Sequence, residues 1–381
     1  MPTIFDLQST DDPRDIVHRT VQALAEGQVV GIPTDTVYGL AAHALCPEAA
    51  DRLYEIKGRS NSAPLAISVR SRDAAGDLFG ELSPVARRLT QRCWPGPLTL
   101  VLPCDSPRSA ASQLPDGVRE RITGEGNCIG FRVVNHRILS HIHRFLAAPL
   151  LLTSANISGK SAPKTASDVA DQLGDAIPLL LDDVPTRYGG ASSVVRVRGD
   201  RWEMLREGVI ERAAMNQFVK PVIAVVCTGN TCRSPMAETL LREQIRVKFG
   251  SEDAIRVVSA GVAAGVGSGA SPQAVQVMGE RGLDLTSHCS QQLDDNIMNV
   301  ADLVLTMTRG HRAAILAAWP NMHERVFTMR HDGGDITDPV GMPVDVYQDC
   351  AKQIDEELAT WLDNLGEGFL PSEVKNDGDS P

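Results

Sequence analysis

The chain has 381 residues, more than one ordinary domain holds, which predicts two domains. Charge is unevenly distributed: residues 1–212 carry 24 basic and 25 acidic side chains, whereas residues 213–381 carry 13 and 23. The acidic second half is therefore a poor candidate for nucleic-acid binding. No apolar run approaches the roughly 18 residues of a membrane span, the start lacks a signal-like pattern, and eight cysteines without paired C-x-x-C ligands suit a reducing compartment. We expect a cytoplasmic protein with no membrane partner.

Helical and strand patterns alternate through the first half. Apolar side chains at helical spacing predict helices over residues 15–26, 49–57 and 85–92. Short apolar runs bounded by Gly or Pro predict strands over residues 29–33, 65–69, 98–102, 129–134 and 150–153. This alternation predicts an α/β domain with a largely parallel or mixed sheet.

Polar clusters lie at the ends of these predicted strands, where open α/β sheets bind ligands. Thr34-Asp35-Thr36 follows the first strand, and Ser154-Ala155-Asn156 ends the last one. Lys57-Gly58-Arg59 precedes the second strand. Two cations two residues apart, beside hydroxyl groups, suit a triphosphate and a carboxylate. A solvated charge pair is the alternative for the two cations alone.

Together with the segment WPGPLT at residues 94–99, these motifs stand in the order typical of the YrdC-like threonylcarbamoyl-AMP synthase family, which residues 10–212 resemble. The resemblance implies an open twisted α/β sheet. It also implies that L-threonine, bicarbonate and ATP with Mg²⁺ become threonylcarbamoyl-AMP and pyrophosphate, for the tRNA-modifying machinery that transfers the threonylcarbamoyl group. By position it assigns threonine binding to Thr36, Arg59, Arg132 and Ser192, and ATP binding to Lys57, Ser154, Asn156 and Arg206. A non-catalytic RNA-binding or regulatory module of the same fold is the alternative.

Two positions depart from the residues usual in that family. Ser68 stands where a histidine is common, and Val134 replaces a usual proline, so full synthase activity is left open. His136, His141 and His143 lack a ligand pattern with Cys or Asp, and we expect them on a helix surface rather than in a metal site.

In the second half, the segment CTGNTCRSP at residues 227–235 follows the apolar run 222–226, which predicts a strand that ends at Cys227. The next N–H groups can surround an oxyanion, and Arg233 can hold two phosphate oxygens with its guanidinium. A helix N-terminus and a guanidinium both favour a reactive thiolate. Pro235 suits the first turn of the helix, where we expect that helix to begin. A buried structural cysteine is the alternative.

Residues 220–370 resemble the low-molecular-weight protein-tyrosine-phosphatase family, which has a Rossmann-like fold with a central parallel sheet. The resemblance implies a phosphatase without a cofactor, in which Cys227 is the nucleophile and Asp338 is the general acid and then the base. Arg233 would hold the phosphate and Ser234 would ease the departure of the thiolate. The remaining contacts to the phosphate would come from Thr228, Gly229, Asn230 and Cys232.

Substrate choice depends on the centre of this loop. The stretch CTGNTCRSPMAE closely resembles the bacterial protein-arginine phosphatases, in which the threonine at Thr231 marks the preference. Val340 stands where an aromatic residue is usual and leaves the substrate open. The resemblance favours phosphoarginine over phosphotyrosine in a phosphorylated protein. A tyrosine phosphatase and an arsenate reductase are the alternatives.

The sequence thus predicts a bifunctional cytoplasmic enzyme. We expect a synthase domain over residues 1–212, a linker over 213–219, a phosphatase domain over 220–370 and a disordered tail over 371–381.

Overall fold

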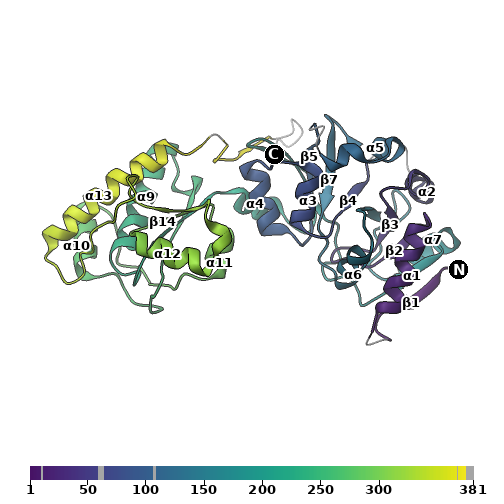
Figure 1. Cartoon of the computed structure of the whole chain (residues 1–381), viewed down its shortest axis with the longest axis horizontal. Helices are drawn as coiled ribbons and strands as arrows, with labels where there is room; N and C mark the ends of the chain where they lie inside the picture. The colour runs from purple at the N-terminus through teal and green to yellow at the C-terminus, as the bar shows by residue number, and fades with distance from the viewer. Residues whose placement is uncertain (10–11, 59–63, 106–108, 367, 375–381) are drawn as a thin grey trace. The chain divides into compact units, whose positions relative to one another are not determined.

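The computed structural model describes residues 1–9, 12–58, 64–105, 109–366 and 368–374. The chain forms two compact units (Figure 1). The first contains residues 1–218 and the segment from Ser372 onward, and the second contains residues 219–371. Arg59 and the part of the expected tail from residue 375 onward lie outside the described residues. Within the described ranges, no helix is long and apolar enough to cross a membrane.

A mixed sheet forms the centre of the first unit, as the alternating pattern predicts. Its strands are ordered β1-β9-β2-β3-β8-β4-β7-β5-β10-β11-β16, with β6 beside β7. The strands are β1 (Thr3–Asp6), β2 (Val30–Ile32), β3 (Gly39–His43), β4 (Ala66–Ser68), β5 (Leu98–Pro103), β6 (Thr123–Gly124), β7 (Cys128–Arg132), β8 (Leu150–Ser154), β9 (Leu179–Asp182), β10 (Ser193–Arg198), β11 (Arg201–Arg206) and β16 (Ser372–Glu373). The helices are α1 (Arg14–Ala25), α2 (Pro47–Lys57), α3 (Arg72–Phe79), α4 (Pro84–Cys93), α5 (Asp116–Ile122), α6 (Arg137–Phe145), α7 (Ala166–Leu173) and α8 (Arg212–Val219).

Local sequence explains how these elements bring side chains to the sheet edge. Helix α1 buries Val17 and Leu24 in a cluster that also contains residues of α6, β2 and β8. Helix α2 has proline in its first turn and ends at Gly58, whose left-handed φ of 56° is easy for glycine. Lys57 is therefore fixed as the last residue of a helix whose apolar face is buried.

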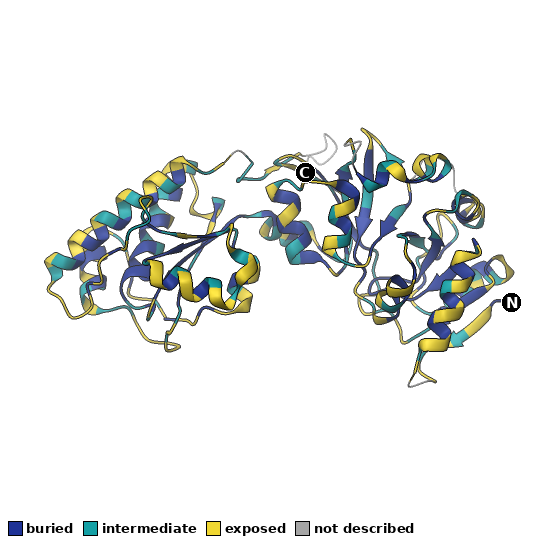
Figure 2. Ribbon diagram, in the orientation of Figure 1, coloured by how far each residue is buried: buried dark blue, intermediate teal, exposed yellow. Residues whose placement is uncertain are grey.

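The second unit has a parallel sheet ordered β13-β12-β14-β15, which confirms the Rossmann-like expectation. Its strands are β12 (Val222–Cys227), β13 (Arg256–Gly261), β14 (Leu303–Thr306) and β15 (Val326–Thr328). Its helices are α9 (Arg233–Phe249), α10 (Pro272–Glu280), α11 (Asp295–Val300), α12 (Arg309–Ala318) and α13 (Val344–Asp363). Every residue of β12 is buried, as expected for a central parallel strand covered on both faces (Figure 2).

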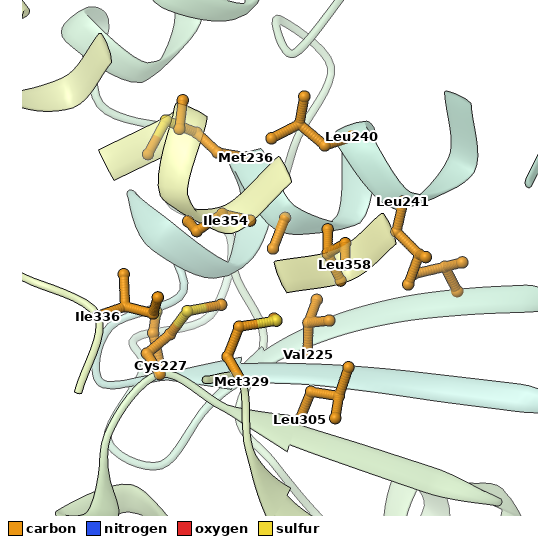
Figure 3. Packing of buried hydrophobic residues seen from close by; sticks show 14 of the residues in the cluster. Val225, Cys227, Met236, Leu240, Leu241, Leu305, Met329, Ile336, Ile354 and Leu358 are labelled. Atoms are coloured by element: carbon orange, nitrogen blue, oxygen red, sulfur yellow. The ribbon is translucent and has the colours of Figure 1, made fainter. Parts of the chain in front are cut away.

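Two apolar clusters cover the two faces of this sheet. On one face, Val225 and Leu305 of the strands pack with Leu240 of α9 and with Ile354 and Leu358 of α13 (Figure 3). On the other face, residues of α11 and α12 pack against the alternate side chains of β12 and β14. Cys227 ends β12 at the margin of the first cluster, so the core fixes the backbone of Cys227.

The structure differs from four local expectations. Helix α9 begins at Arg233, two residues before Pro235, because the loop backbone turns helical as soon as it has passed Cys232. His143 is buried rather than on a helix surface: its Nε2 lies 3.1 Å from Ser68 Oγ, and burial lowers the pKa of His143 to about 4. The expected disordered tail begins with a strand, since β16 pairs in parallel with β11. The residues expected as a linker lie in α8.

Candidate active sites

A cavity of about 670 Å³ in the first unit gathers the predicted ligand-binding side chains. Its walls come from segments far apart in the sequence, because residues of seven strands that are consecutive in the sheet, β3-β8-β4-β7-β5-β10-β11, line it. The predicted residues that line it are Thr36, Lys57, Arg132, Ser154, Asn156, Ser192 and Arg206. The structure therefore brings together every predicted ligand-binding residue of this unit that it describes.

Lys57 is buried against the end of β8. Its Nζ donates to Ser154 O at 2.6 Å and to Asn156 Oδ1 at 3.1 Å. The Asn156 amide donates in turn to the carbonyls of Ile157 and Lys160, at 2.9 and 2.8 Å. These bonds fix the ammonium at the cavity wall, where a positive charge favours a polyphosphate.

Arg132, the last residue of β7, enters the cavity from another side. Its Nη2 donates to Asp35 Oδ1 at 2.7 Å, and its Nε donates to Gly96 O at 3.2 Å. Burial lowers the pKa of Arg132, and the neighbouring Asp35 carboxylate opposes that shift. Asp35 Oδ2 is buried and has no hydrogen-bond partner in the part of the chain that the structure describes. The guanidinium is thus oriented by a carboxylate that does not line the cavity.

Ser192 and Arg206 form the opposite wall. Arg206 donates through Nη2 to Ser192 O at 2.8 Å and to Ser192 Oγ at 3.1 Å, and Thr99 Oγ1 lies 3.1 Å from the same hydroxyl. Ser192 therefore holds the Arg206 guanidinium through both its carbonyl and its hydroxyl, and both residues line the cavity.

Sequence reasoning gave no role to three residues at this site. Asp35 lies between two threonines directly after a strand. A carboxylate at that position is the sequence feature that could have indicated its role. The other two, Arg196 and Glu125, line the cavity itself, and Arg196 Nη2 lies 3.1 Å from Glu125 Oε2. Ser192, Val194 and Arg196 all line it, which is the two-residue period of a strand.

In the second unit, Cys227 is 3% exposed and its sulfur receives several polar contacts. Ser234 Oγ lies 3.0 Å from Cys227 Sγ, and the Asn230 N–H donates to the same sulfur at 3.2 Å. Donors aimed at the sulfur stabilise negative charge on it. The loop thus supplies a setting for a thiolate at the N-terminus of α9.

Asn230 fixes the curvature of the loop. It has φ of 54°, in the left-handed region that asparagine tolerates. Its amide donates to Ser234 Oγ at 3.0 Å and to Ser259 Oγ at 2.9 Å, and its Oδ1 accepts from Gln291 N at 2.8 Å. His288 Nε2 lies 2.7 Å from Asn230 O. The bend is held by several other segments.

Arg233 and Asp338 meet at the mouth of this loop. Arg233 Nη2 forms an ion pair with Asp338 Oδ2, and its Nη1 donates to Ile336 O at 3.2 Å. The Arg233 side chain is 5% exposed and that of Asp338 is 48% exposed. The carboxylate therefore reaches solvent while the guanidinium is fixed below it, which suits a group that exchanges protons with a substrate.

The remaining loop positions differ in exposure. Thr228 is exposed, Gly229 and Thr231 are half-buried, and Cys232 is buried as the residue before α9. Cys232 Sγ lies 3.4 Å from the hydroxyl of Tyr347 on α13. Within the described part of the chain, the one polar contact of the Thr231 hydroxyl is a long one, 3.7 Å, to Cys232 Sγ.

The first unit is similar in sequence to a known protein family. Residues 22–208 match the family model Sua5_yciO_yrdC, described as telomere recombination. The chain is 33% identical over 219 residues to a threonylcarbamoyl-AMP synthase of Bacillus subtilis, covering 58% of this chain and 60% of that protein. A Mycobacterium tuberculosis relative is 30% identical over 210 residues, which cover 55% of this chain and 92% of the relative. A solved structure of Pyrococcus abyssi Sua5, 22% identical, matches 87% of this chain and 100% of that chain with a TM-score of 0.51, which shows the fold alone.

The chain spans 60% and 48% of the lengths of the Bacillus subtilis and Pyrococcus abyssi synthases that it matches in sequence.

Residues 222–370 match the model of low molecular weight phosphotyrosine protein phosphatases. A protein-arginine-phosphatase of Geobacillus stearothermophilus is 40% identical over 149 residues, which cover 38% of this chain and 93% of that protein. The Ralstonia solanacearum protein EpsP, which carries a low molecular weight protein-tyrosine-phosphatase name, is 35% identical over 144 residues, covering 38% and 94%. This chain therefore belongs to the Sua5/YrdC family through residues 22–208 and to the low molecular weight phosphatase family through residues 222–370.

Proposed function

We propose that the chain is a bifunctional enzyme, with an L-threonylcarbamoyl-AMP synthase in its first unit and a cysteine-dependent protein phosphatase in its second. The observation that supports the synthase is the cavity shared by Thr36, Lys57, Arg132 and the walls at Ser154 and Ser192. Its cations and hydroxyls suit a substrate set of one amino acid and one triphosphate.

The synthase reaction needs positioning more than acid–base chemistry. The threonine amine attacks bicarbonate to give a carbamate with loss of water, and a carbamate oxygen then attacks the α-phosphorus of ATP and displaces pyrophosphate. Lys57, Asn156 and Arg206 would bind ATP, with Ser154 completing the wall. Thr36, Arg132 and Ser192, with Arg59, would hold threonine.

Mg²⁺ would enter this site with the nucleotide. In the described ranges, no group of three or more His, Cys, Asp or Glu is placed to hold a metal ion. Mg²⁺ in such sites is commonly held by substrate phosphates, water and one or two carboxylates, so the ion would be bound chiefly through the nucleotide. When bound, it neutralises charge on the phosphates, and the cations of the cavity wall would complete that neutralisation.

Pyrophosphate release tests the synthase. We expect release from ATP to require both L-threonine and bicarbonate, and Lys57→Ala to slow it roughly 10²- to 10³-fold because one fixed cation is lost. Lys248→Ala, at a partly exposed ion pair in the other unit, is the matched control. Folded protein that releases no pyrophosphate would instead support a non-catalytic RNA-binding or regulatory module.

The phosphatase proposal depends on the contacts among Cys227, Ser234, Arg233 and Asp338. Cys227 would attack phosphorus to form a phosphocysteine while Asp338 protonates the leaving group. Water then attacks this intermediate with Asp338 as the base, and inorganic phosphate leaves. Ser234 would stabilise the departing thiolate. The loop from Thr228 to Cys232 would bind the phosphoryl oxygens through backbone N–H groups.

We further propose that phosphoarginine is the preferred substrate, because the Thr231 hydroxyl has no strong hydrogen-bond partner among the residues that the structure describes. Identity to named arginine phosphatases supports this choice. A phosphotyrosine or arsenate substrate is the alternative.

The tRNA-modifying threonylcarbamoyl transferase machinery would use the product of the first unit. The eight free thiols fit the reducing cytoplasm in which we place both activities.

Substitution of Thr231 tests the substrate preference. Thr231→Ile should lower the ratio of kcat/KM for phosphoarginine to that for phosphotyrosine peptides by about tenfold, since one hydrogen bond is lost. Thr360→Ile, at an exposed position of α13, controls for the added bulk. A ratio that does not change would remove Thr231 as the selector.

A further inference from the structure

A histidine outside the phosphate loop contacts that loop beside the nucleophile. His311 lies in the first turn of α12, where its N–H donates to the Thr308 hydroxyl at 3.2 Å. Its Nε2 lies 2.8 Å from Oγ1 of Thr228, the residue directly after Cys227. The phosphatase chemistry proposed above assigns no task to this contact.

The ring is buried and close to the charged groups of the site. His311 is 8% exposed, and burial lowers its pKa. The Arg233 charge lowers that pKa further, whereas the Asp338 and Asp335 carboxylates raise it. The neutral ring therefore predominates near pH 7, with one N–H and one unprotonated nitrogen.

The surroundings decide which nitrogen carries the proton. Nδ1 of His311 is buried and has no hydrogen-bond partner within the described ranges. A buried N–H without an acceptor costs more than an acceptor without a donor. The proton therefore belongs on Nε2, and Nε2–H donates to the Thr228 hydroxyl oxygen.

This direction has a consequence for Thr228. Its side-chain oxygen accepts from His311, so its own hydroxyl proton remains available to donate. The His311 contact accounts for all of the hydrogen bonding of this side chain to the residues that the structure describes, and Thr228 is exposed. The free proton can therefore reach a group that arrives from solvent.

We propose that His311 is a positioning residue that orients the Thr228 hydroxyl as a donor to an oxygen of the bound phosphoryl group. This inference rests on the proposed phosphatase function of the second unit. The loop would then bind phosphate with a side-chain donor as well as with its backbone N–H groups and Arg233. Because the ring is neutral, it adds no charge that would draw Asp338 away from Arg233.

Hydrolysis of p-nitrophenyl phosphate by the full chain tests the pair. His311→Ala and Thr228→Val should each lower kcat/KM about ten- to hundredfold, as for a lost hydrogen bond to a charged group. The kcat/KM of the double variant should be no lower than that of the less active single variant, because both changes remove the same donor. His311→Gln should recover to within about threefold of wild type, because its amide can place an N–H near the position of Nε2. Two results would overturn the proposal. In one, the kcat/KM losses of the two single variants multiply in the double variant; in the other, His311→Gln is as impaired as His311→Ala.

Control substitutions separate this role from a general effect on α12. His323→Gln changes a 68% exposed histidine beyond the end of the same helix and should leave kcat/KM unchanged. Long-range ¹H–¹⁵N spectra of the full chain, labelled at histidine, should show His311 as the Nε2–H tautomer. A proton on Nδ1 would contradict the assigned direction of the bond.

Binding of inorganic phosphate distinguishes failure of this inference from failure of the phosphatase. Calorimetry should show weaker phosphate binding in His311→Ala and recovery in His311→Gln. If the chain binds phosphate in this pattern but hydrolyses nothing, the proposed function fails and the role of His311 stands. If hydrolysis depends on Cys227 but is indifferent to His311, the inference alone is wrong.

Discussion

Cys227→Ser should abolish hydrolysis of p-nitrophenyl phosphate, with a loss of roughly 10⁴-fold or more, as expected when a covalent nucleophile is removed. The serine hydroxyl stays protonated near neutral pH, so the donors that Asn230 and Ser234 direct at this position would have no anion to stabilise. Steady-state kinetics on the full chain measures the loss. Turnover comparable to wild type would refute the nucleophile assignment.

Two controls sharpen this experiment. Cys289→Ser changes an exposed thiol and should leave the kinetics unchanged. Inorganic phosphate should still bind to Cys227→Ser, because Arg233 and the loop N–H groups remain. Pyrophosphate release by the first unit should also be unaffected, which would show that the two reactions use separate sites.

Asp35→Ala should destabilise the first unit by about 3–5 kcal/mol and remove synthase activity. The Asp35 and Arg132 side chains are 1% and 7% exposed, so removal of the carboxylate leaves a buried guanidinium without its counter-charge. Hydrogen exchange in increasing urea, followed in peptides of each unit, measures the change, and peptides of the second unit serve as an internal reference.

A paired replacement separates stability from function at this site. Asp35→Leu combined with Arg132→Met should regain much of the lost stability, because apolar side chains of similar size can replace a buried ion pair. Synthase activity should not return, since the oriented guanidinium is gone. Asp15→Ala breaks an exposed pair with Arg19 and should change stability by less than about 1 kcal/mol. Recovered activity in the double variant would show that Arg132 has no part in the reaction.

Motifs whose residues lie within a few positions of one another in the sequence could be predicted well. The loop from Cys227 to Pro235 contains Cys227, the positive-φ Asn230 and Arg233 in one segment, so spacing alone predicted that they share one loop. The strand and helix cores could also be predicted, because apolar periodicity marks them directly. The resemblance to known families connected Asp338 to the loop, which no local pattern does.

Contacts between distant segments were missed. The meeting of Asp35 with Arg132 depends on strand order, which single-sequence patterns do not give. His311 lies in a helix and looks like any polar helical residue until α12 is packed beside the loop. His143 was expected on a surface, yet packing beneath β4 buries it against Ser68. In each case tertiary packing, rather than local propensity, decides the surroundings of the side chain.

The pairing of β16 with β11 makes the second unit an insertion, in sequence, within the first unit rather than a tandem addition. Strand β11 carries Arg206 at its end, and β16 lies along it as the last strand of the sheet. β16 pairs only with Arg201 and Trp202, at the start of β11, so a fragment cut at residue 212 would lose the strand partner of these two residues and lengthen the open edge of the sheet, a feature that promotes self-association. Ser372 and Glu373, which follow the second unit in sequence, thus cover part of the sheet edge of the first unit.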